Sequence, residues 1–202
     1  MKRWKDRAVP KIQAPSIAAH RELRRQQLIG AAMELALEGG AEAITVSAVA
    51  QKAGLSRSSI YEYFSSSADL VADLVIEELD YYTARLADAI KDATDPFEKI
   101  ELWMAEGLRY VEDGRHMLVK SLNTVSTPEF RKEEIAMGHR KLISPLREAL
   151  AQTGIKEVAS AAAFLQSVTD AASMRIDAGN DAELEIQNAV KFAVAGLRAL
   201  AR

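Results

Sequence analysis

Residues 45–64 combine hydroxyl, basic and aromatic side chains at helical spacing, a composition suited to contacts with phosphates and base edges. In the second half of this stretch, Ser58, Tyr61 and Glu62 are spaced i, i+3 and i+4, so a helix presents them on one face. Arg57 lies beside that face and adds a positive charge. The pattern predicts a surface that binds double-stranded DNA through hydrogen bonds and charge.

Two short helices must hold this surface in place. Ser56 is the expected N-cap of the second helix, and Ile60 and Phe64 are expected to pin that helix onto the first. Thr45 is the expected N-cap of the first helix, and Gly54 its end, because glycine adopts a positive φ without strain. An apolar stripe at i, i+3, i+4 and i+7 predicts the first helix, about two turns long: Val46, Val49, Ala50 and Ala53. The two segments together predict a helix-turn-helix.

A further helix begins soon after this pair. Ser66 and Asp69 form an S-x-x-D capping box in front of an apolar run that starts at Leu70. An ordinary helical hairpin with solvated serines and half-buried tyrosines is the alternative interpretation of residues 45–64. A second helix this short and polar adds little to packing, which favours the helix-turn-helix.

From about Leu28 to Leu70 the chain resembles the DNA-binding domain of the TetR (tetracycline-repressor) family of bacterial transcription regulators. Three segments match in order: L-I-G-A-A-M-E-L-A-L-E-G-G, then I-T-V-S-A-V-A-Q-K-A-G-L-S-R-S-S-I-Y-E-Y-F, then S-S-S-A-D-L. The resemblance implies an all-α fold, with an amino-terminal helix-turn-helix domain of three helices and a carboxy-terminal helical domain for ligand binding and dimerisation. The expected parts are a basic arm at 1–20, the DNA-binding domain at 21–67 and the regulatory domain at 68–202.

The resemblance also implies individual DNA contacts. Thr45 is expected to touch a phosphate, and Arg57 stands where the family often has a DNA-contacting lysine. Ser47 and Ser67 depart from the family pattern, since a base-reading arginine and a phosphate-binding lysine are common at these positions. The full expected DNA-binding set is Thr45, Ser47, Ser56, Arg57, Ser58, Ser59, Tyr61, Glu62, Tyr63 and Ser67.

Charge is divided unevenly along the chain. Ten basic and six acidic side chains precede residue 68, a net charge of +4, and the overall charge of -3 leaves -7 for the rest. A positive end releases counterions from DNA, and the acidic remainder is expected to stay clear of the phosphates. Much of the excess lies before or at the start of the first helix, in Lys2, Arg3, Lys5, Arg7, Lys11, Arg21, Arg24 and Arg25. The arm that this predicts either follows the DNA backbone or minor groove or is only a solubilising tail.

Beyond Leu70 the sequence predicts only helices, at about 70–90, 96–112, 115–123, 128–152, 156–178 and 181–200. The last two favour a homodimer through an intermolecular four-helix bundle, although their apolar faces could instead fill the monomer's core. The residues concerned are Ala159, Ala161, Ala162, Ala163, Ala171 and Ala172 in the first helix, and Leu184, Val190, Val194 and Leu197 in the second. A two-fold dimer predicts a palindromic operator with recognition helices about 34 to 36 Å apart.

The resemblance further implies a pocket for a small-molecule effector among the middle helices. Its expected lining is Trp103, Met104, Tyr110, His116, Met117, Phe164 and Val168, each of which could also be an ordinary core residue. The implied mechanism is linkage: the effector favours a state with low DNA affinity and shifts the long helix at 70–90.

The parts of an enzyme are missing from the sequence. The chain has no cysteine and only three histidines. Helical bundles can bind two iron ions through paired Glu-x-x-His motifs, but the nearest sequence here, Asp113-x-x-His116, occurs only once. No glycine-rich phosphate loop or G-x-S-x-G elbow occurs, so we expect no catalytic residue, metal or cofactor. No run of about 18 apolar residues occurs either, which predicts a cytoplasmic protein. The expected function is that of a ligand-responsive transcriptional repressor. The alternatives are a regulator that acts through a protein partner and a transcriptional activator.

Overall fold

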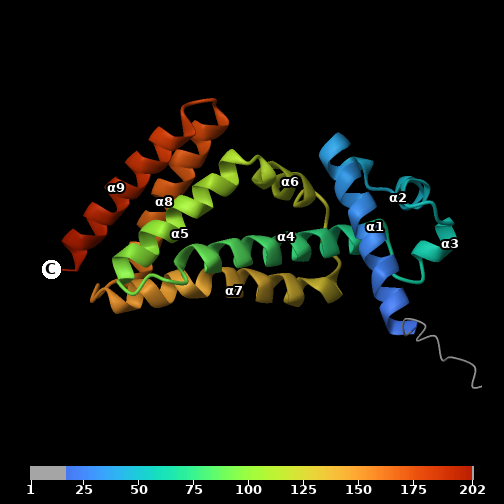
Figure 1. Ribbon diagram of the computed structural model, residues 1–202, viewed down its shortest axis with the longest axis horizontal. Coiled ribbons are helices and arrows are strands. Elements are labelled where there is room, and N and C mark those ends of the chain that lie inside the picture. Colours follow the sequence, from blue (N-terminus) through green and yellow to red (C-terminus); the bar gives the residue numbers. More distant parts are fainter. Residues whose placement is uncertain (1–16, 202) are drawn as a thin grey trace, which may run out of the picture.

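The computed structural model describes residues 17–201, which form nine α-helices and one 3-10 helix without a β-strand (Figure 1). The predicted all-α class is confirmed. The elements are α1 (Ile17–Gly39), η1 (Ala41–Ala43), α2 (Val46–Lys52), α3 (Arg57–Ile60), α4 (Ser67–Ile90), α5 (Pro96–Glu112), α6 (Arg115–Leu122), α7 (Glu129–Gln152), α8 (Val158–Asp177) and α9 (Ala182–Leu200). Within residues 17–201, no helix combines the length and the apolar character that crossing a bilayer requires.

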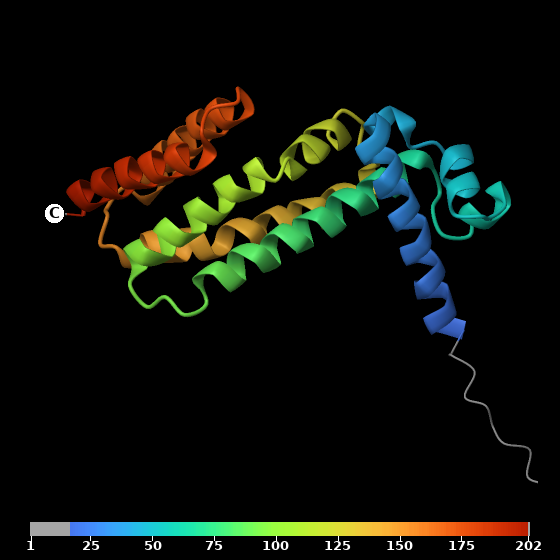
Figure 2. The same ribbon diagram turned by 45° about the horizontal axis from the view of Figure 1, so that its top comes forward.

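The molecule is elongated, with α1 to α3 at one end and α5, α8 and α9 at the other (Figures 1 and 2). The long helix α4 begins beside α1 and runs into the larger part, where it packs against α5, α6 and α7. Buried apolar side chains form one cluster from Leu28 in α1 to Leu197 in α9. The end formed by α1 to α3 is therefore packed directly onto the rest of the molecule.

Local hydrogen bonds explain where the short helices begin. The Thr45 hydroxyl accepts from the Ala48 N–H at 3.1 Å, and the Ser56 hydroxyl accepts from the Ser59 N–H at 3.1 Å. Gly54 has a φ of 66° in the turn between α2 and α3, a conformation that glycine adopts without strain. The predicted caps and turn are confirmed.

The capping box at the start of α4 differs from the expectation by one residue. Ser66 accepts from the Asp69 N–H as predicted. The Asp69 carboxylate, however, accepts from both the N–H and the hydroxyl of Ser65, at 2.9 and 3.0 Å. Asp69 thereby fixes the loop that joins α3 to α4.

The expected basic arm lies largely outside the described residues, including Lys2, Arg3, Lys5, Arg7 and Lys11. Because α1 already begins at Ile17, residues 17–20 belong to a helix rather than to an extended arm. The basic residues at 21, 24 and 25 are likewise helical.

Helix α7 runs beside α4 over much of its length in both ribbon views. It continues from Glu129 to Gln152 through Pro145. The two helices approach closely at Gly138, where an added Cβ would lie 3.0 Å from Leu79 Cδ1. Leu142 and Leu146 are buried one and two turns further on. A small residue at 138 therefore permits tight packing of α7 on α4.

Candidate nucleic-acid interface and regulatory surfaces

Helices α2 and α3 separate their apolar and polar side chains as the sequence predicts. Val46, Val49, Ala50, Ile60 and Phe64 are buried. All ten residues of the expected DNA-binding set remain accessible to solvent. Seven are exposed, namely Thr45, Ser47, Ser56, Arg57, Ser58, Tyr61 and Glu62, and three are half-buried, namely Ser59, Tyr63 and Ser67.

Helix α3 is shorter than the sequence predicts. The α-helix ends at Ile60, and the residues that follow form turns in which the Glu62 and Tyr63 N–H groups donate to the carbonyls of Ser59 and Ile60. Tyr61 and Glu62 therefore lie just beyond the helix, not on a continuous helical face with Ser58. The polar surface is a single helical turn followed by a tight turn.

Hydroxyl groups at the start of α3 are linked to one another. The Ser56 hydroxyl lies 2.8 Å from the hydroxyls of both Ser58 and Ser59 while it caps the helix. These hydrogen bonds fix three hydroxyl groups at the amino-terminal end of α3, where unpaired helix N–H groups favour anions. The arrangement suits contact with a phosphate.

The two cations of this helix pair differ in their surroundings. Lys52 lies 2.7 Å from a Glu38 oxygen and 3.1 Å from a Glu34 oxygen, both on α1. Hydrogen bonds to these two carboxylates raise the pKa of Lys52 above its ordinary value. Arg57 makes no ion pair within residues 17–201 and is exposed. Of these two cations, Arg57 is the one left without an ion pair in residues 17–201.

A basic hollow lies where α1 meets the end of the expected recognition segment, which is α3 together with the turn that follows it. Its volume is about 530 Å³, and it is lined by His20, Arg21, Arg24, Glu62 and Tyr63. The Arg21 guanidinium donates to the Glu62 carbonyl at 3.3 Å and lies 5.9 Å from the centre of the Tyr63 ring. Sequence reasoning grouped Arg21, Arg24 and Arg25 together, but Arg25 is turned away and pairs with Asp73 at 2.6 Å.

The expected effector-binding residues occupy separate environments. Trp103, Met104 and Tyr110 are buried in the core, whereas Met117 and Phe164 are exposed on the surface. His116 and Val168 are half-buried. The effector site formed by these seven residues therefore stays a prediction.

Tyr110 belongs to a buried polar cluster between α4, α5 and α6. Its hydroxyl donates to the Glu78 carboxylate at 2.8 Å, and Arg115 donates to the same carboxylate through Nε and Nη2, at 2.8 and 2.6 Å. Burial and the bond to Glu78 raise the pKa of Tyr110 well above its usual range. Tyr82 stacks on Tyr110 with ring centres 4.1 Å apart, and burial raises the pKa of Tyr82 to about 12. The Tyr110 hydroxyl is engaged by the protein itself.

His116 connects α6 to the end of α8. Its Nε2 lies 2.7 Å from Asp177 Oδ1, and the Lys120 ammonium lies 2.9 Å from the other oxygen. The hydrogen bond from Lys120, with the charges of Lys120 and His116, lowers the pKa of Asp177 below its ordinary value. This contact holds α6 against α8.

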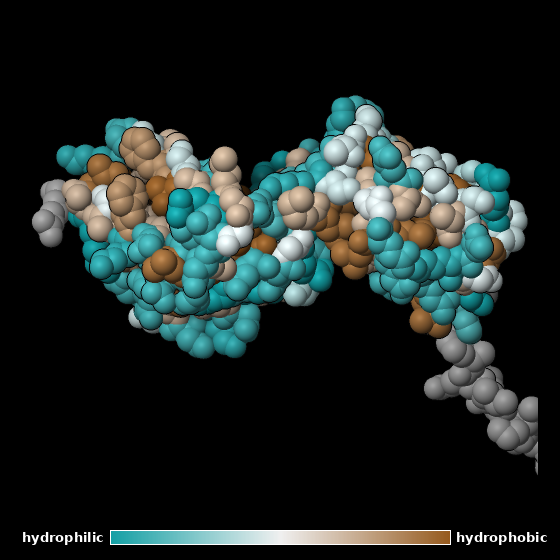
Figure 3. Space-filling view, turned by 90° about the horizontal axis from the view of Figure 1, so that it is seen from above, coloured by the Kyte–Doolittle hydropathy of each residue, from teal (hydrophilic) through white to brown (hydrophobic). Residues whose placement is uncertain are grey.

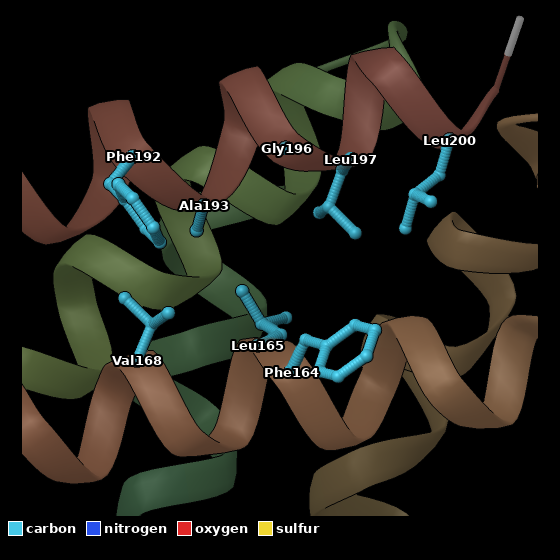
Figure 4. Close-up of a pocket in the computed structure, with 8 residues that line it drawn as sticks. All are labelled: Phe164, Leu165, Val168, Phe192, Ala193, Gly196, Leu197 and Leu200. Carbon is cyan, nitrogen blue, oxygen red and sulfur yellow. The ribbon is translucent and has the colours of Figure 1, made fainter.

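The outer face of α8 and α9 carries exposed apolar side chains, and brown and tan atoms gather over this end of the molecule (Figure 3). Phe164 is 61% exposed and Phe192 is 71% exposed. Side chains from the two helices point toward one another across a groove of about 260 Å³ (Figure 4). Its lining is Phe164, Leu165, Val168, Phe192, Ala193, Gly196, Leu197 and Leu200.

Part of the stripe expected at a dimer interface lies inside the protomer. Val190 and Leu197 are buried, and Val194 is half-buried, because that face of α9 packs on α5 and α8. On α8, Ala161 and Ala172 are buried too. The exposed residues of the expected set are Ala159, Ala163, Ala171 and Leu184. The outer face is therefore formed largely by residues outside that set, such as Phe192, Gly196 and Leu200.

Comparison with known proteins places these features in a family. Residues 28–74 match the family described as "Bacterial regulatory proteins, tetR family". The chain is 32% identical over 90 residues to the HTH-type transcriptional repressor KstR2 of Mycobacterium tuberculosis, a match that covers 44% of this chain and 45% of that protein. It is 26% identical over 136 residues to the fatty acid metabolism regulator protein of Bacillus subtilis, covering 65% and 70%. The chain thus spans less than half the length of the KstR2 repressor.

Solved structures share the fold over nearly their whole length. The transcriptional regulator FadR from Bacillus subtilis in complex with stearoyl-CoA has a TM-score of 0.67 at 22% identity, covering 85% of this chain and 98% of that one. A TetR-like regulator from Rhodococcus sp. RHA1 has a TM-score of 0.66 at 21% identity, covering 88% and 97%.

The fold and the polar surface of α2 and α3 together define a helix-turn-helix protein with an attached all-helical domain. The match at residues 28–74 to the TetR family of bacterial regulatory proteins, and the fold shared with a TetR-like regulator, agree with the resemblance found in the sequence. Of the relatives named above, KstR2 is a transcriptional repressor and the Bacillus subtilis protein is a regulator of fatty acid metabolism.

Proposed function

We propose that the protein is a cytoplasmic transcriptional repressor that binds a palindromic operator as a homodimer and is released by a small-molecule effector. The observation that carries this proposal is the exposed hydroxyl, tyrosine and arginine surface of α2 and α3, held by two capped helix starts. The family match at residues 28–74 and the repressors among the relatives support it.

On this proposal, DNA contacts extend from α3 to α1. Arg57 supplies a free charge, and the linked hydroxyls of Ser56 and its neighbours bind phosphate oxygens. Arg21 and Arg24, beside Tyr63, contact phosphates of the DNA backbone next to the recognition segment. Each such cation releases a counterion, so the positive amino-terminal end supplies affinity without sequence preference.

Selection of binding sites from random duplex DNA with the purified protein tests the proposal. We expect a palindromic consensus whose affinity falls steeply as salt rises from about 50 to 200 mM. If no sequence is enriched even at low salt, DNA is not the target, and the alternative of a regulator that acts through a protein partner replaces this proposal. A reporter gene placed behind the selected operator then separates repression from activation.

The proposed dimer forms through the outer face of α8 and α9. Exposed phenylalanines beside small residues allow helices of two copies to approach closely, as in a four-helix bundle. For two copies of α3 to enter successive turns of the major groove, the two-fold axis of this dimer must set them about 34 to 36 Å apart.

The proposed effector is a long-chain fatty acyl-CoA. The similar FadR structure was solved with stearoyl-CoA, and an amphipathic anion suits a groove of about 520 Å³ between α5 and α9. This groove combines apolar side chains at Leu102, Ile186, Val190 and Val194 with three cations, Arg109, Lys191 and Arg198, and two carboxylates, Glu101 and Glu183. Stearoyl-CoA should weaken operator binding, whereas free coenzyme A should not. If stearoyl-CoA raises the melting temperature but leaves operator affinity unchanged, the linkage is absent.

A further inference from the structure

A cluster of ionic side chains joins the DNA-binding end to the regulatory domain. Arg131, in the first turn of α7, reaches α4 and pairs with Asp73, and its Nε lies 3.3 Å from an Asp69 oxygen. The Arg131 side chain is 17% exposed and the Asp73 side chain 4% exposed. These charges are largely withdrawn from water, where an ion pair is screened little by salt.

The same Asp73 carboxylate also binds a cation of the DNA-binding domain. Arg25 on α1 lies 2.6 Å from Asp73 Oδ2, the oxygen other than the one paired with Arg131. One buried carboxylate of α4 thus joins an arginine from α1 to an arginine from α7. Removal of either arginine leaves Asp73 with a single cation.

The second branch of the cluster reaches the loop in front of α4. Asp69, beside Arg131, accepts from the N–H and hydroxyl of Ser65. Ser65 follows the buried Phe64, which anchors the recognition segment to the core. Arg131 is therefore two contacts away from the segment that faces DNA.

Arg131 also lies where a movement of α7 would be transmitted. α7 packs along α4, with a close approach at Gly138 and Leu79 two turns beyond Arg131. The amino-terminal ends of both helices meet next to α1 (Figures 1 and 2). A shift of α7 along α4 would change the contacts of Arg131 with both carboxylates at once.

We propose that Arg131 is a positioning residue for DNA binding, which holds α1 and the α3–α4 loop in the orientation that presents α3 to the operator. The inference rests on the proposed function. Asp69 and Asp73 are one helical turn apart, so without Arg131 these two largely buried like charges keep Arg25 as their one paired cation within residues 17–201. The contact between α1, α4 and α7 then loosens, and α3 is no longer held in the orientation that binds the operator.

Arg131→Ala tests this, with Arg140→Ala as the matched control. Arg140 is also on α7, and its ion pair with Glu133 at 2.6 Å is exposed. We expect Arg131→Ala to weaken binding to the selected operator by about tenfold or more, a typical coupling between sites. The slope of affinity against salt should not change, because Arg131 contacts no phosphate on this proposal. Hydrogen exchange should become faster at the Ser65 amide, and Arg140→Ala should change none of these quantities.

Two further variants keep the proposal falsifiable. Arg131→Lys should recover part of the affinity, because an ammonium pairs with one carboxylate but lacks the forked geometry that engages two. Arg131→Gln replaces alanine if circular dichroism reports that Arg131→Ala does not fold. The effects of Arg25→Ala and Arg131→Ala should be non-additive, because both arginines bind Asp73.

Three outcomes would overturn the inference: wild-type affinity in a folded Arg131 variant, a salt slope that falls together with affinity, or equal losses in the Arg131 and Arg140 variants. If the wild-type protein binds no DNA in the selection, the proposed function itself fails. That failure is distinguished because it appears before any variant is compared.

Discussion

At the scale of single residues, DNA binding depends on which polar groups are already occupied. Lys52 and Arg57 lie on neighbouring helices, but two carboxylates of α1 bind Lys52, whereas Arg57 is exposed without an ion pair in residues 17–201. A charge that is already neutralised gains little from a phosphate. The two residues should therefore differ in function although both are basic.

Arg57→Ala should weaken operator binding by about 1 to 3 kcal/mol, the usual loss for one direct DNA contact. Lys52→Ala is the control, and its operator affinity should stay within about twofold of wild type, since the Lys52 ammonium is paired with two carboxylates of α1. Fluorescence anisotropy with a labelled operator measures both constants. Equal losses in the two variants would contradict the assignment of Arg57.

Asp177 gives a prediction for pH at the same scale. Lys120 lowers the pKa of this carboxylate in the folded state, so its contribution to stability is present above the unfolded pKa and is lost as pH falls through the lower folded value. Asp177→Asn should therefore be less stable than wild type at pH 7, and the difference should shrink below about pH 4. Urea denaturation from pH 7 to 3 measures this. Asp170→Asn, at an exposed position of the same helix, is the control and should show a smaller difference at pH 7.

At the scale of elements, α9 has two apolar faces with different roles. The inner face, with Ile186 and Val190, is buried in the protomer, while the outer face presents Phe192 and Leu200 to solvent. An exposed face of this kind on a monomer marks an interaction surface. The proposed dimer uses the outer face only.

Phe192→Glu should therefore give a monomer that no longer binds the palindromic operator tightly, because a buried charge without a partner opposes association. Phe130→Glu is the matched control, since Phe130 on α7 is also exposed, at 67%, but lies outside this face. Sedimentation velocity compares the oligomeric states. A Phe192→Glu protein that remains dimeric would exclude this interface.

At the scale of the whole molecule, one core and one charge gradient connect the two ends. Buried apolar side chains run from α1 to α9 without a break, so the end formed by α1 to α3 is not an independent body on a linker. Positive charge is concentrated before residue 68, and the rest is acidic. On the proposed function, this gradient turns the amino-terminal end of the molecule toward DNA.

The replacement of both Arg21 and Arg24 by alanine should lower the salt slope of operator affinity by about two, because each phosphate contact contributes roughly one. Arg25→Ala should leave the slope unchanged, since Arg25 pairs with Asp73 instead of facing the hollow. Titrations at several salt concentrations separate these outcomes. Equal slopes in the double variant and the wild type would remove α1 from the DNA interface.

The sequence by itself determined the features that depend on a few neighbouring residues. The caps at Thr45 and Ser56 and the turn at Gly54 each involve groups within four residues, so type and spacing suffice to predict them. The buried positions Ile60 and Phe64 follow in the same way from helical periodicity. The fold class and the family resemblance rest on these local signals.

Only the tertiary structure decided how groups distant in the chain are paired. Arg21 and Arg25 are alike in sequence, but one lies beside Tyr63 and the other binds Asp73, 48 residues away. Val190 and Phe192 are both apolar, yet only Val190 faces α5 and the core. A side chain's role depends on which element packs against it, and helical periodicity does not specify the partner. The junction of Arg25, Asp73 and Arg131 is formed by three helices, so it exists only in the folded molecule.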